Sequence, residues 1–153
     1  MKVIVKNKRA FFDNEMLEKE IAGISLLGHE VKSVKNGEIT LDGAYVIVSA
    51  DKAILRNAII PAWKHANASS IAGYDKARDR ILLLTKKQIL HLYQKRKEMK
   101  AQVVPIAVLL ERNLVKIEIG LARTMKKFDK RLRKKERDEK LNVQRIAKTV
   151  EIR

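Results

Sequence analysis

The sequence predicts a mainly β fold, a small antiparallel barrel with flanking helices, followed by a basic C-terminal tail. Two observations predict the barrel: apolar and polar residues alternate through 114–121, and a β-branched and aliphatic run at 103–110 precedes them. A third predicts the tail, because basic residues concentrate after residue 122. A chain of 153 residues is long enough for one core. We therefore expect a core at 1–122 and a tail at 123–153.

The predicted strands form two hairpins. Residues 103–110 and 114–121 are separated by a short polar break, which favours an antiparallel pair. Pro105 has no backbone N–H, so its strand is expected to begin at an edge or at a bulge. A second hairpin is expected from residues 44–48 and 53–58.

Two helices are predicted within the core. Thr85 and Gln88 have the spacing of a capping box, which begins a helix over residues 86–100. A shorter helical turn is expected over residues 29–35, because a Gly follows soon after it and can end it.

Two segments lack a clear period. Residues 17–27 carry apolar side chains on both faces and fit neither a helix nor a strand better. Residues 61–80 contain several Asn, Ser and Gly residues and are expected to form a surface loop. Short antiparallel strands with one substantial helix favour a barrel of the oligonucleotide-binding kind or a similar one.

The charge of the chain indicates a polyanionic partner. Lys and Arg number 34 and Asp and Glu number 18, which gives a net charge of +16 and a pI of about 10.2. Nucleic acid is the first candidate, because each phosphate that Lys or Arg neutralises releases counterions. An anionic membrane surface is the second.

Several classes of protein are disfavoured. The chain has no cysteine, which excludes a disulfide framework and the commonest zinc sites and is typical of a reducing cytoplasm. It contains no apolar run long enough to span a bilayer and no secretory signal at its start. We therefore expect a soluble protein that does not associate with a membrane.

Catalytic motifs are absent from the sequence. His29, His65 and His91 lie far apart, so they do not have the spacing of a metal site, and structural or surface roles are favoured over acid–base work. Neither a phosphate-binding glycine loop nor a serine nucleophile motif occurs. We predict no cofactor, no metal and no enzyme activity, although a nuclease built from isolated carboxylates stays open.

The tail carries half of the net charge. Residues 123–153 contain thirteen Lys and Arg and five Asp and Glu, a net charge of +8. Between Arg123 and Lys140 the only large apolar side chains are Met125, Phe128 and Leu132, too few to offset the entropy of ordering the segment. We expect the tail to be disordered when free and helical when bound.

The basic clusters near the N-terminus and in the tail are the first candidates for nucleic-acid contact, and a solvated charged face is the alternative for any single cluster. The scarce aromatic residues favour recognition of a folded RNA by shape and phosphate over a single-stranded stacking platform. Candidates for stacking are Trp63, Tyr74, Phe11 and Phe12, and the Phe pair fits a core position better.

Glu30 is a carboxylate close to Lys32 and Lys35. Spacing alone leaves two roles open, a surface ion pair or an acceptor for RNA amino and hydroxyl groups.

Three stretches resemble the SsrA-binding protein family, also called small protein B. They are Asn7 to Ala10, Ala22 to Ser33, and Leu121 to Arg123 with Lys126 to Arg131. The most specific part is the element Gly28-x-Glu30-Val31-Lys32-Ser33, and Asp129-Lys130-Arg131 supports it. The resemblance extends in order over nearly the whole chain.

The resemblance implies an oligonucleotide-binding barrel and an RNA-binding adaptor of trans-translation. Members of this family bind the tRNA-like domain of transfer-messenger RNA (tmRNA, or SsrA RNA) and deliver it to stalled bacterial ribosomes. There the barrel and the RNA together mimic a tRNA, and the tail occupies the empty mRNA channel near ribosomal RNA of the decoding region. It also implies a cytoplasmic protein that we expect to be monomeric when free. A ribosomal-type protein that binds ribosomal RNA structurally is the alternative.

The resemblance assigns roles to individual residues. Those implied to bind tmRNA are Asn7, Lys8, Arg9, Glu30, Lys32, Ser33, Lys126 and Lys127. Those implied to bind the ribosome through the tail are Phe128, Asp129, Lys130, Arg131, Arg133, Lys134, Lys135 and Arg137.

The chain departs from the family at two places. Thr124 and Met125 stand where the family usually has a Gly before the tail, and residues 61–80 lack the family's usual motifs. Contacts that relatives make through that loop are therefore not assigned to this chain.

Overall fold

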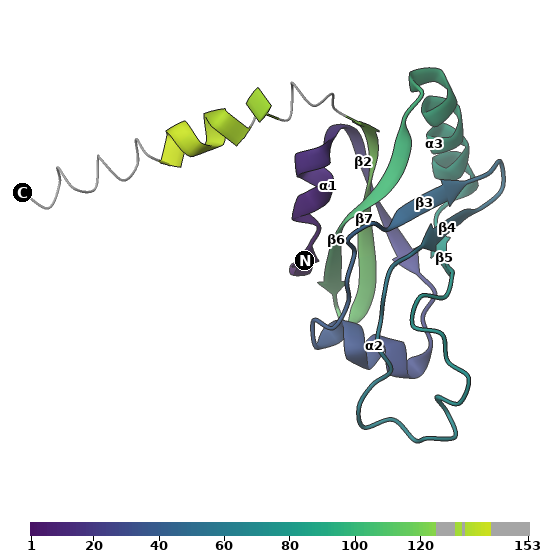
Figure 1. Cartoon of the computed structure of the whole chain (residues 1–153). Coiled ribbons are helices and arrows are strands. Elements are labelled where there is room, and N and C mark those ends of the chain that lie inside the picture. The colour runs from purple at the N-terminus through teal and green to yellow at the C-terminus, as the bar shows by residue number, and fades with distance from the viewer. Residues whose placement is uncertain (125–130, 133, 142–153) are drawn as a thin grey trace, which may run out of the picture. The chain divides into compact units, whose positions relative to one another are not determined.

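The structure is a computed structural model that describes residues 1–124, 131–132 and 134–141. The chain divides into two units, Met1–Arg123 and Thr124–Arg153. The first unit contains the sheet and its helices, and the second follows its last strand (Figure 1).

Seven strands and three helices make up the first unit in the order β1, α1, β2, α2, β3, β4, β5, α3, β6, β7. The strands are β1 (Lys2–Lys6), β2 (Asn14–Ile24), β3 (Tyr45–Val48), β4 (Ala53–Arg56), β5 (Arg80–Leu83), β6 (Gln102–Glu111) and β7 (Leu114–Thr124). The helices are α1 (Lys8–Asp13), α2 (Gly28–Lys35) and α3 (Lys86–Met99).

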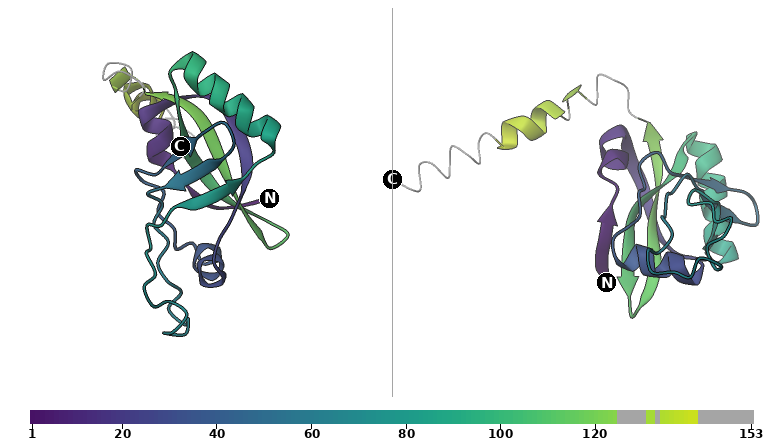
Figure 2. Two further views of the ribbon diagram at one scale, coloured as in Figure 1. Left: turned by 90° about the vertical axis from the view of Figure 1, so that its right-hand side faces the viewer. Right: turned by 60° about the horizontal axis from the view of Figure 1, so that its bottom comes forward.

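The sheet closes on itself. The strand order is β1-β6-β3-β4-β5-β2-β7, and β6 also pairs with β7, so six of the seven strands form a ring and β1 adds to β6. Strand β6 pairs with β1, β3 and β7, and its register with β7 shifts between Pro105 and Ala107. This bulge is one of the two positions predicted for Pro105. The antiparallel sheet and its helices confirm that the fold is mainly β with flanking helices, and Figure 2 shows the strands curving around one interior.

Both predicted hairpins are confirmed. Strands β6 and β7 pair antiparallel from Gln102 opposite Ala122 to Glu111 opposite Leu114. Arg112 and Asn113 make the turn with φ of 49° and 66°, the left-handed values that a tight hairpin requires. Strands β3 and β4 form the second hairpin, and β4 ends before its predicted limit because Asn57 takes a φ of 63°.

The predicted helices are confirmed with small changes at their ends. Thr85 and Gln88 form the capping box of α3, and Lys100 ends that helix in the left-handed conformation. Helix α2 covers the region predicted as a helical turn. The segment without a clear period, 17–27, lies mostly in β2, and α1 was not predicted at all.

The core lies inside the closed sheet. Alternate residues of β7, Ile117, Ile119 and Leu121, are fully buried, as the alternation of the sequence predicted. They pack in one cluster with buried residues of the other strands and with Ile89 and Leu92 of α3. Helix α3 contacts β3 and β6, whereas α1 contacts β2 and β6 (Figure 1).

The second unit is helical where it is described. Residues 131–132 and 134–141 are helical, and all of them are exposed. Acidic residues placed three and four positions from basic ones favour such a helix. Disorder of the free tail stays a prediction. The rest of the tail prediction lies outside the described residues.

Gly120 allows β7 to approach β2 and β6 closely. A Cβ atom at this position would lie 2.6 Å from Ile106 Cδ1 and 2.9 Å from Met16 Sδ.

We expect Gly120→Val to lower the free energy of unfolding by about 1–3 kcal/mol through overpacking, measured by urea denaturation. Gly28→Val is the matched control, since an added Cβ there meets no atom within 4 Å. Equal stability of the two variants would contradict this account of the packing.

Candidate nucleic-acid interface

The first candidate cluster is built around the start of α1. Asn7 caps this helix, because its side-chain oxygen accepts a hydrogen bond from the Ala10 N–H at 3.2 Å. Its side-chain amide donates to the carbonyl oxygens of Pro105 at 2.9 Å and Leu41 at 3.3 Å. One side chain therefore fixes α1 against β6 and against the segment that follows α2. Lys8 and Arg9 are exposed on the first turn.

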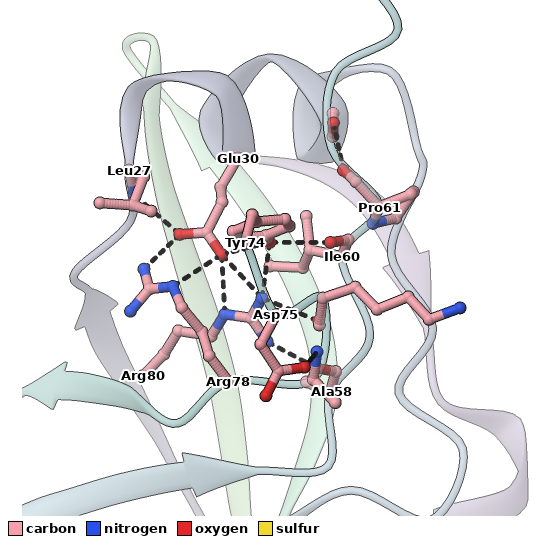
Figure 3. Close-up of polar contacts among 12 residues, drawn as sticks. Leu27, Glu30, Ala58, Ile60, Pro61, Tyr74, Asp75, Arg78 and Arg80 are labelled. Atoms are coloured by element: carbon pink, nitrogen blue, oxygen red, sulfur yellow. Dashed lines mark hydrogen bonds and ion pairs between the residues drawn. The ribbon is translucent and has the colours of Figure 1, made fainter. Parts of the chain in front are cut away.

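The second candidate cluster is centred on Glu30 in α2 (Figure 3). The Glu30 carboxylate is fully buried, and Arg80, the first residue of β5, is buried with it. Arg80 donates to Glu30 Oε2 from Nη2 at 2.7 Å and from Nε at 3.1 Å. Arg78 donates to Oε2 from Nε at 3.1 Å and pairs with Oε1 through Nη2.

Further groups complete this network. The Leu27 backbone N–H donates to Glu30 Oε1 at 2.8 Å, and the Tyr74 hydroxyl lies 2.6 Å from Oε2. Arg80 also donates from Nη1 to the Ala58 carbonyl oxygen at 2.6 Å. Each oxygen of the carboxylate thus accepts several hydrogen bonds, as a buried charge requires. The network joins α2 to the loop before β5.

The hydrogen bonds decide the charge state of Glu30. Burial alone raises the pKa of its carboxyl group, but hydrogen bonds from Arg78, the Leu27 N–H, Tyr74 and Arg80 outweigh burial and lower the pKa to about 2. Burial and the adjacent Glu30 carboxylate raise the pKa of Tyr74 to about 12. Glu30 is therefore ionised and Tyr74 neutral at physiological pH.

Three of the residues predicted to contact RNA are buried in this structure. Asn7, Glu30 and Ser33 are buried, and their polar atoms already bond to the protein. Ser33 donates from Oγ to the Pro61 carbonyl oxygen at 2.7 Å, which ties α2 to the start of the loop. In the structure these three side chains hold α1 and α2 in position. Glu30 forms a buried ion pair, which corrects the surface ion pair that was one of its two predicted roles, and RNA contact by Asn7, Glu30 and Ser33 stays a prediction.

The remaining predicted contacts are either exposed or outside the described residues. Lys8, Arg9 and Lys32 are exposed in the first unit. In the second unit Arg131, Lys134, Lys135 and Arg137 are helical and exposed. Lys126, Lys127, Phe128, Asp129, Lys130 and Arg133 lie outside the described residues.

Sequence reasoning missed Arg78 and Arg80, because the segment before β5 was predicted to be only a surface loop. One signal was available. In β5, Arg80 and Leu82 face inward whereas Ile81 and Leu83 are exposed, so the arginine shares the register of a core residue. A charge at a core register implies a buried partner, and Glu30 is that partner.

The aromatic and histidine residues singled out in the sequence lie in different surroundings. Tyr74 belongs to the Glu30 network, and Phe11 lies at the surface with the Lys19 ammonium 5.3 Å from its ring centre. His91 pairs with Glu18 at 2.7 Å. Over the described ranges, no group of three or more His, Asp or Glu side chains is arranged to hold a metal ion. Over the same ranges no helix is long and apolar enough to cross a membrane.

Comparison with known proteins identifies the family. The sequence model of a family described as SmpB protein matches residues 4–149. The chain belongs to the SmpB family. This confirms the resemblance that the sequence motifs indicated.

Individual relatives of the SmpB family cover almost the whole chain. The SsrA-binding protein of Sulfurihydrogenibium sp. (strain YO3AOP1) is 40% identical over 147 residues, which is 96% of this chain and 95% of the relative. That of Mycoplasma mobile is 37% identical over 147 residues, 96% of this chain and 99% of the relative. A solved structure described as "tmRNA-SmpB: a journey to the center of the bacterial ribosome" is 33% identical with a TM-score of 0.66, and the match covers 80% of this chain and 85% of that one.

The buried network yields a test of stability. We expect Glu30→Gln to lower the free energy of unfolding by about 3–5 kcal/mol at pH 7, because it leaves the buried Arg80 guanidinium without its counter-charge. Urea denaturation followed by circular dichroism measures this. Glu98→Gln is the matched control, since Glu98 is 69% exposed and its pair with Lys95 at 3.9 Å contributes little. A loss no larger than the control's would contradict a structural role for the pair.

The same pair fixes the expected pH dependence. The pKa of Glu30 in the folded chain is about 2, below the ordinary value of 4.5, so the stability it contributes is present above pH 4.5 and is lost as the pH falls toward 2. The stability difference between the unsubstituted protein and Glu30→Gln should therefore narrow by up to about 3 kcal/mol over this window. A difference that stays constant from pH 6 to pH 2 would exclude ionised Glu30 as the cause.

Proposed function

We propose that this chain is an RNA-binding adaptor of trans-translation that binds tmRNA and delivers it to stalled ribosomes. One observation carries the proposal: the SmpB family match over residues 4–149 coincides with likeness to a solved tmRNA–SmpB structure at 33% identity. The net charge of +16 suits a partner made of RNA. The adaptor acts by binding and positioning, without bond chemistry.

The first unit supplies a rigid platform for the tRNA-like domain of tmRNA. Lys8 and Arg9 on α1 and Lys32 on α2 are exposed cations that can reach phosphates. Behind them, Asn7, Glu30 and Ser33 hold the two helices in place through buried hydrogen bonds. Because the cations stand on short, anchored helices, their spacing is set before the RNA arrives, which lowers the entropy cost of binding.

The adaptor role also implies a class of barrel, a cellular location and a path for the tail. We assign the closed sheet to the oligonucleotide-binding class of barrels and place the protein in the bacterial cytoplasm, where ribosomes are. The tail enters the mRNA channel, where its exposed Arg131, Lys134, Lys135 and Arg137 meet ribosomal RNA of the decoding region. The protein is a monomer until it binds RNA.

Selective RNA binding tests the proposal. We expect the chain to bind the isolated tRNA-like domain of tmRNA at least tenfold more tightly than ordinary tRNA or ribosomal RNA fragments at physiological salt, measured by electrophoretic mobility shift. A tRNA-mimic must recognise features of one RNA, whereas phosphate contacts alone do not distinguish sequences. Equal affinity for the three RNAs would overturn the adaptor function and favour a ribosomal-type protein.

A charge-matched pair of variants controls for simple electrostatics. Lys8→Ala should weaken binding to the tRNA-like domain. It should also reduce the slope of log affinity against log salt concentration by about 1, which corresponds to the loss of one phosphate contact. Lys52→Ala removes an exposed charge from the β3–β4 turn and should change the affinity less than twofold, since that turn has no assigned contact.

Removal of the tail should separate RNA binding from ribosome rescue. A stop after Thr124 preserves all of β7 and deletes most of the second unit. We expect this truncation to bind the tRNA-like domain within about fivefold of the full chain, because Lys8, Arg9 and Lys32 stay in place and only Lys126 and Lys127 of the residues assigned to tmRNA are lost. Tagging of nascent chains on stalled ribosomes, measured in a reconstituted translation assay, should be abolished. Loss of RNA binding itself, or normal tagging, would contradict this division of labour.

A further inference from the structure

A pocket adjoins the Glu30 network on the outside of the first unit. It lies between the start of α2 and the loop that follows Ile60, and its volume is about 510 Å³. That size is within the range of sites that hold small organic groups. Helix α2 contributes Gly28, His29 and Lys32 to its lining, and the loop contributes Trp63, Asn67 and Ser70.

The lining has the chemistry that an unpaired nucleobase requires. Trp63 provides an aromatic face, and an edge-to-face contact with His65 at 5.4 Å between ring centroids orients it. Asn67 and Ser70 provide an amide and a hydroxyl for the edge of a base, and Lys32 provides a cation for its phosphate. No acidic side chain lines the pocket, so nothing there repels a nucleotide.

The wall of the pocket that α2 forms contains polar atoms without a hydrogen-bond partner among the described residues. Both ring nitrogens of His29 are buried and have no hydrogen-bond partner among the described residues. Buried polar atoms in a native protein are nearly always paired. Because these nitrogens have no exposed surface, a ligand in the pocket bonds to them only if the imidazole ring rotates toward it. The His29 ring packs edge-to-face on Tyr74 with ring centroids 4.5 Å apart, which connects this wall to the network.

The two walls are held together before any ligand binds. Tyr74 and Arg78 of the loop bond to Glu30 of α2, and Ser33 of α2 bonds to Pro61 of the loop. The pocket is therefore a built feature of the fold and does not depend on the RNA to form it.

We propose that this pocket takes one unpaired nucleobase of the bound RNA, which stacks on the Trp63 indole while its phosphate meets Lys32. The proposal rests on the proposed function, because tmRNA supplies the base. It adds a base-reading site on the loop where the chain departs from its relatives. A contact of this kind gives the selectivity that exposed lysines alone do not.

The fluorescence of Trp63 reports whether a base stacks on it, because Trp63 is the only tryptophan of the chain. The full chain is titrated with the tRNA-like domain of tmRNA, and Trp63 emission and the anisotropy of labelled RNA are recorded together. We expect the emission to change with the same midpoint as the anisotropy. Binding without any change in Trp63 emission would overturn the pocket proposal while leaving the proposed function intact. An absence of binding would instead overturn the proposed function.

Substitution measures the contribution of stacking. Trp63→Ala should weaken binding by about five- to 150-fold, the range found for the loss of one base stacked on an aromatic ring. Trp63→Phe keeps an aromatic face and should stay within about threefold of the unsubstituted protein. Leu83→Ala is the control, since it removes an exposed apolar side chain from β5, away from the pocket lining. If Trp63→Ala does not fold by circular dichroism, Trp63→Leu replaces it.

A double-mutant cycle identifies the base. Single abasic sites are introduced into the unpaired nucleotides of the RNA, and each RNA is bound to the unsubstituted protein and to Trp63→Ala. We expect one abasic site to weaken binding to the unsubstituted protein at least fivefold and to have little further effect on Trp63→Ala. Additive losses at every position would show that no base stacks on Trp63.

Discussion

The rest of the structure depends on the buried ion pair between Glu30 and Arg80. Burying one carboxylate costs several kcal/mol, and two arginines, a tyrosine and a backbone N–H offset that cost. Leu27 lies three residues before Glu30, whereas Tyr74, Arg78 and Arg80 come from one segment more than 40 residues later, so the network forms only when α2, the loop and β5 are in place. The network carries one more positive charge than negative charge.

That arrangement separates two tasks among side chains that look alike in the sequence. Buried polar groups set the geometry, and the exposed cations are the groups that we propose for RNA contact. Around α1, Asn7 faces inward and anchors three backbone groups, whereas its neighbours Lys8 and Arg9 are exposed, and Arg9 pairs with Asp13 at 3.4 Å. The same division recurs in α2. Lysine and arginine side chains are long and flexible. The fold can fix only the Cα atoms from which they extend, and the buried residues set the positions of those atoms.

Local sequence patterns were sufficient to predict those strands and helices whose formation depends on residues close together in the sequence. The alternation in β7 and the capping box of α3 are complete within a few residues, and both were confirmed. Strand β2 was not predicted, because it carries apolar side chains on both faces and its pairing with β5 is a long-range contact. Helix α1 has only six residues and begins at a cap whose other bonds reach Leu41 and Pro105, far away in sequence. Arg78 and Arg80 were missed for the same reason, because their partner is about 50 residues earlier in the chain.

One helical motif of the chain combines residues that lie in two different environments. In the element from Gly28 to Ser33, sequence order places Glu30, Lys32 and Ser33 together as one RNA-contacting unit. Helical geometry separates them, because residues three and four apart share a face. Glu30, Ser33 and Val34 are therefore buried on the side toward the core, and Lys32 and Lys35 project into solvent. A motif on a helix is thus two motifs interleaved at a period of 3.6, one for the fold and one for the partner, and only the burial of each side chain assigns it to one or the other.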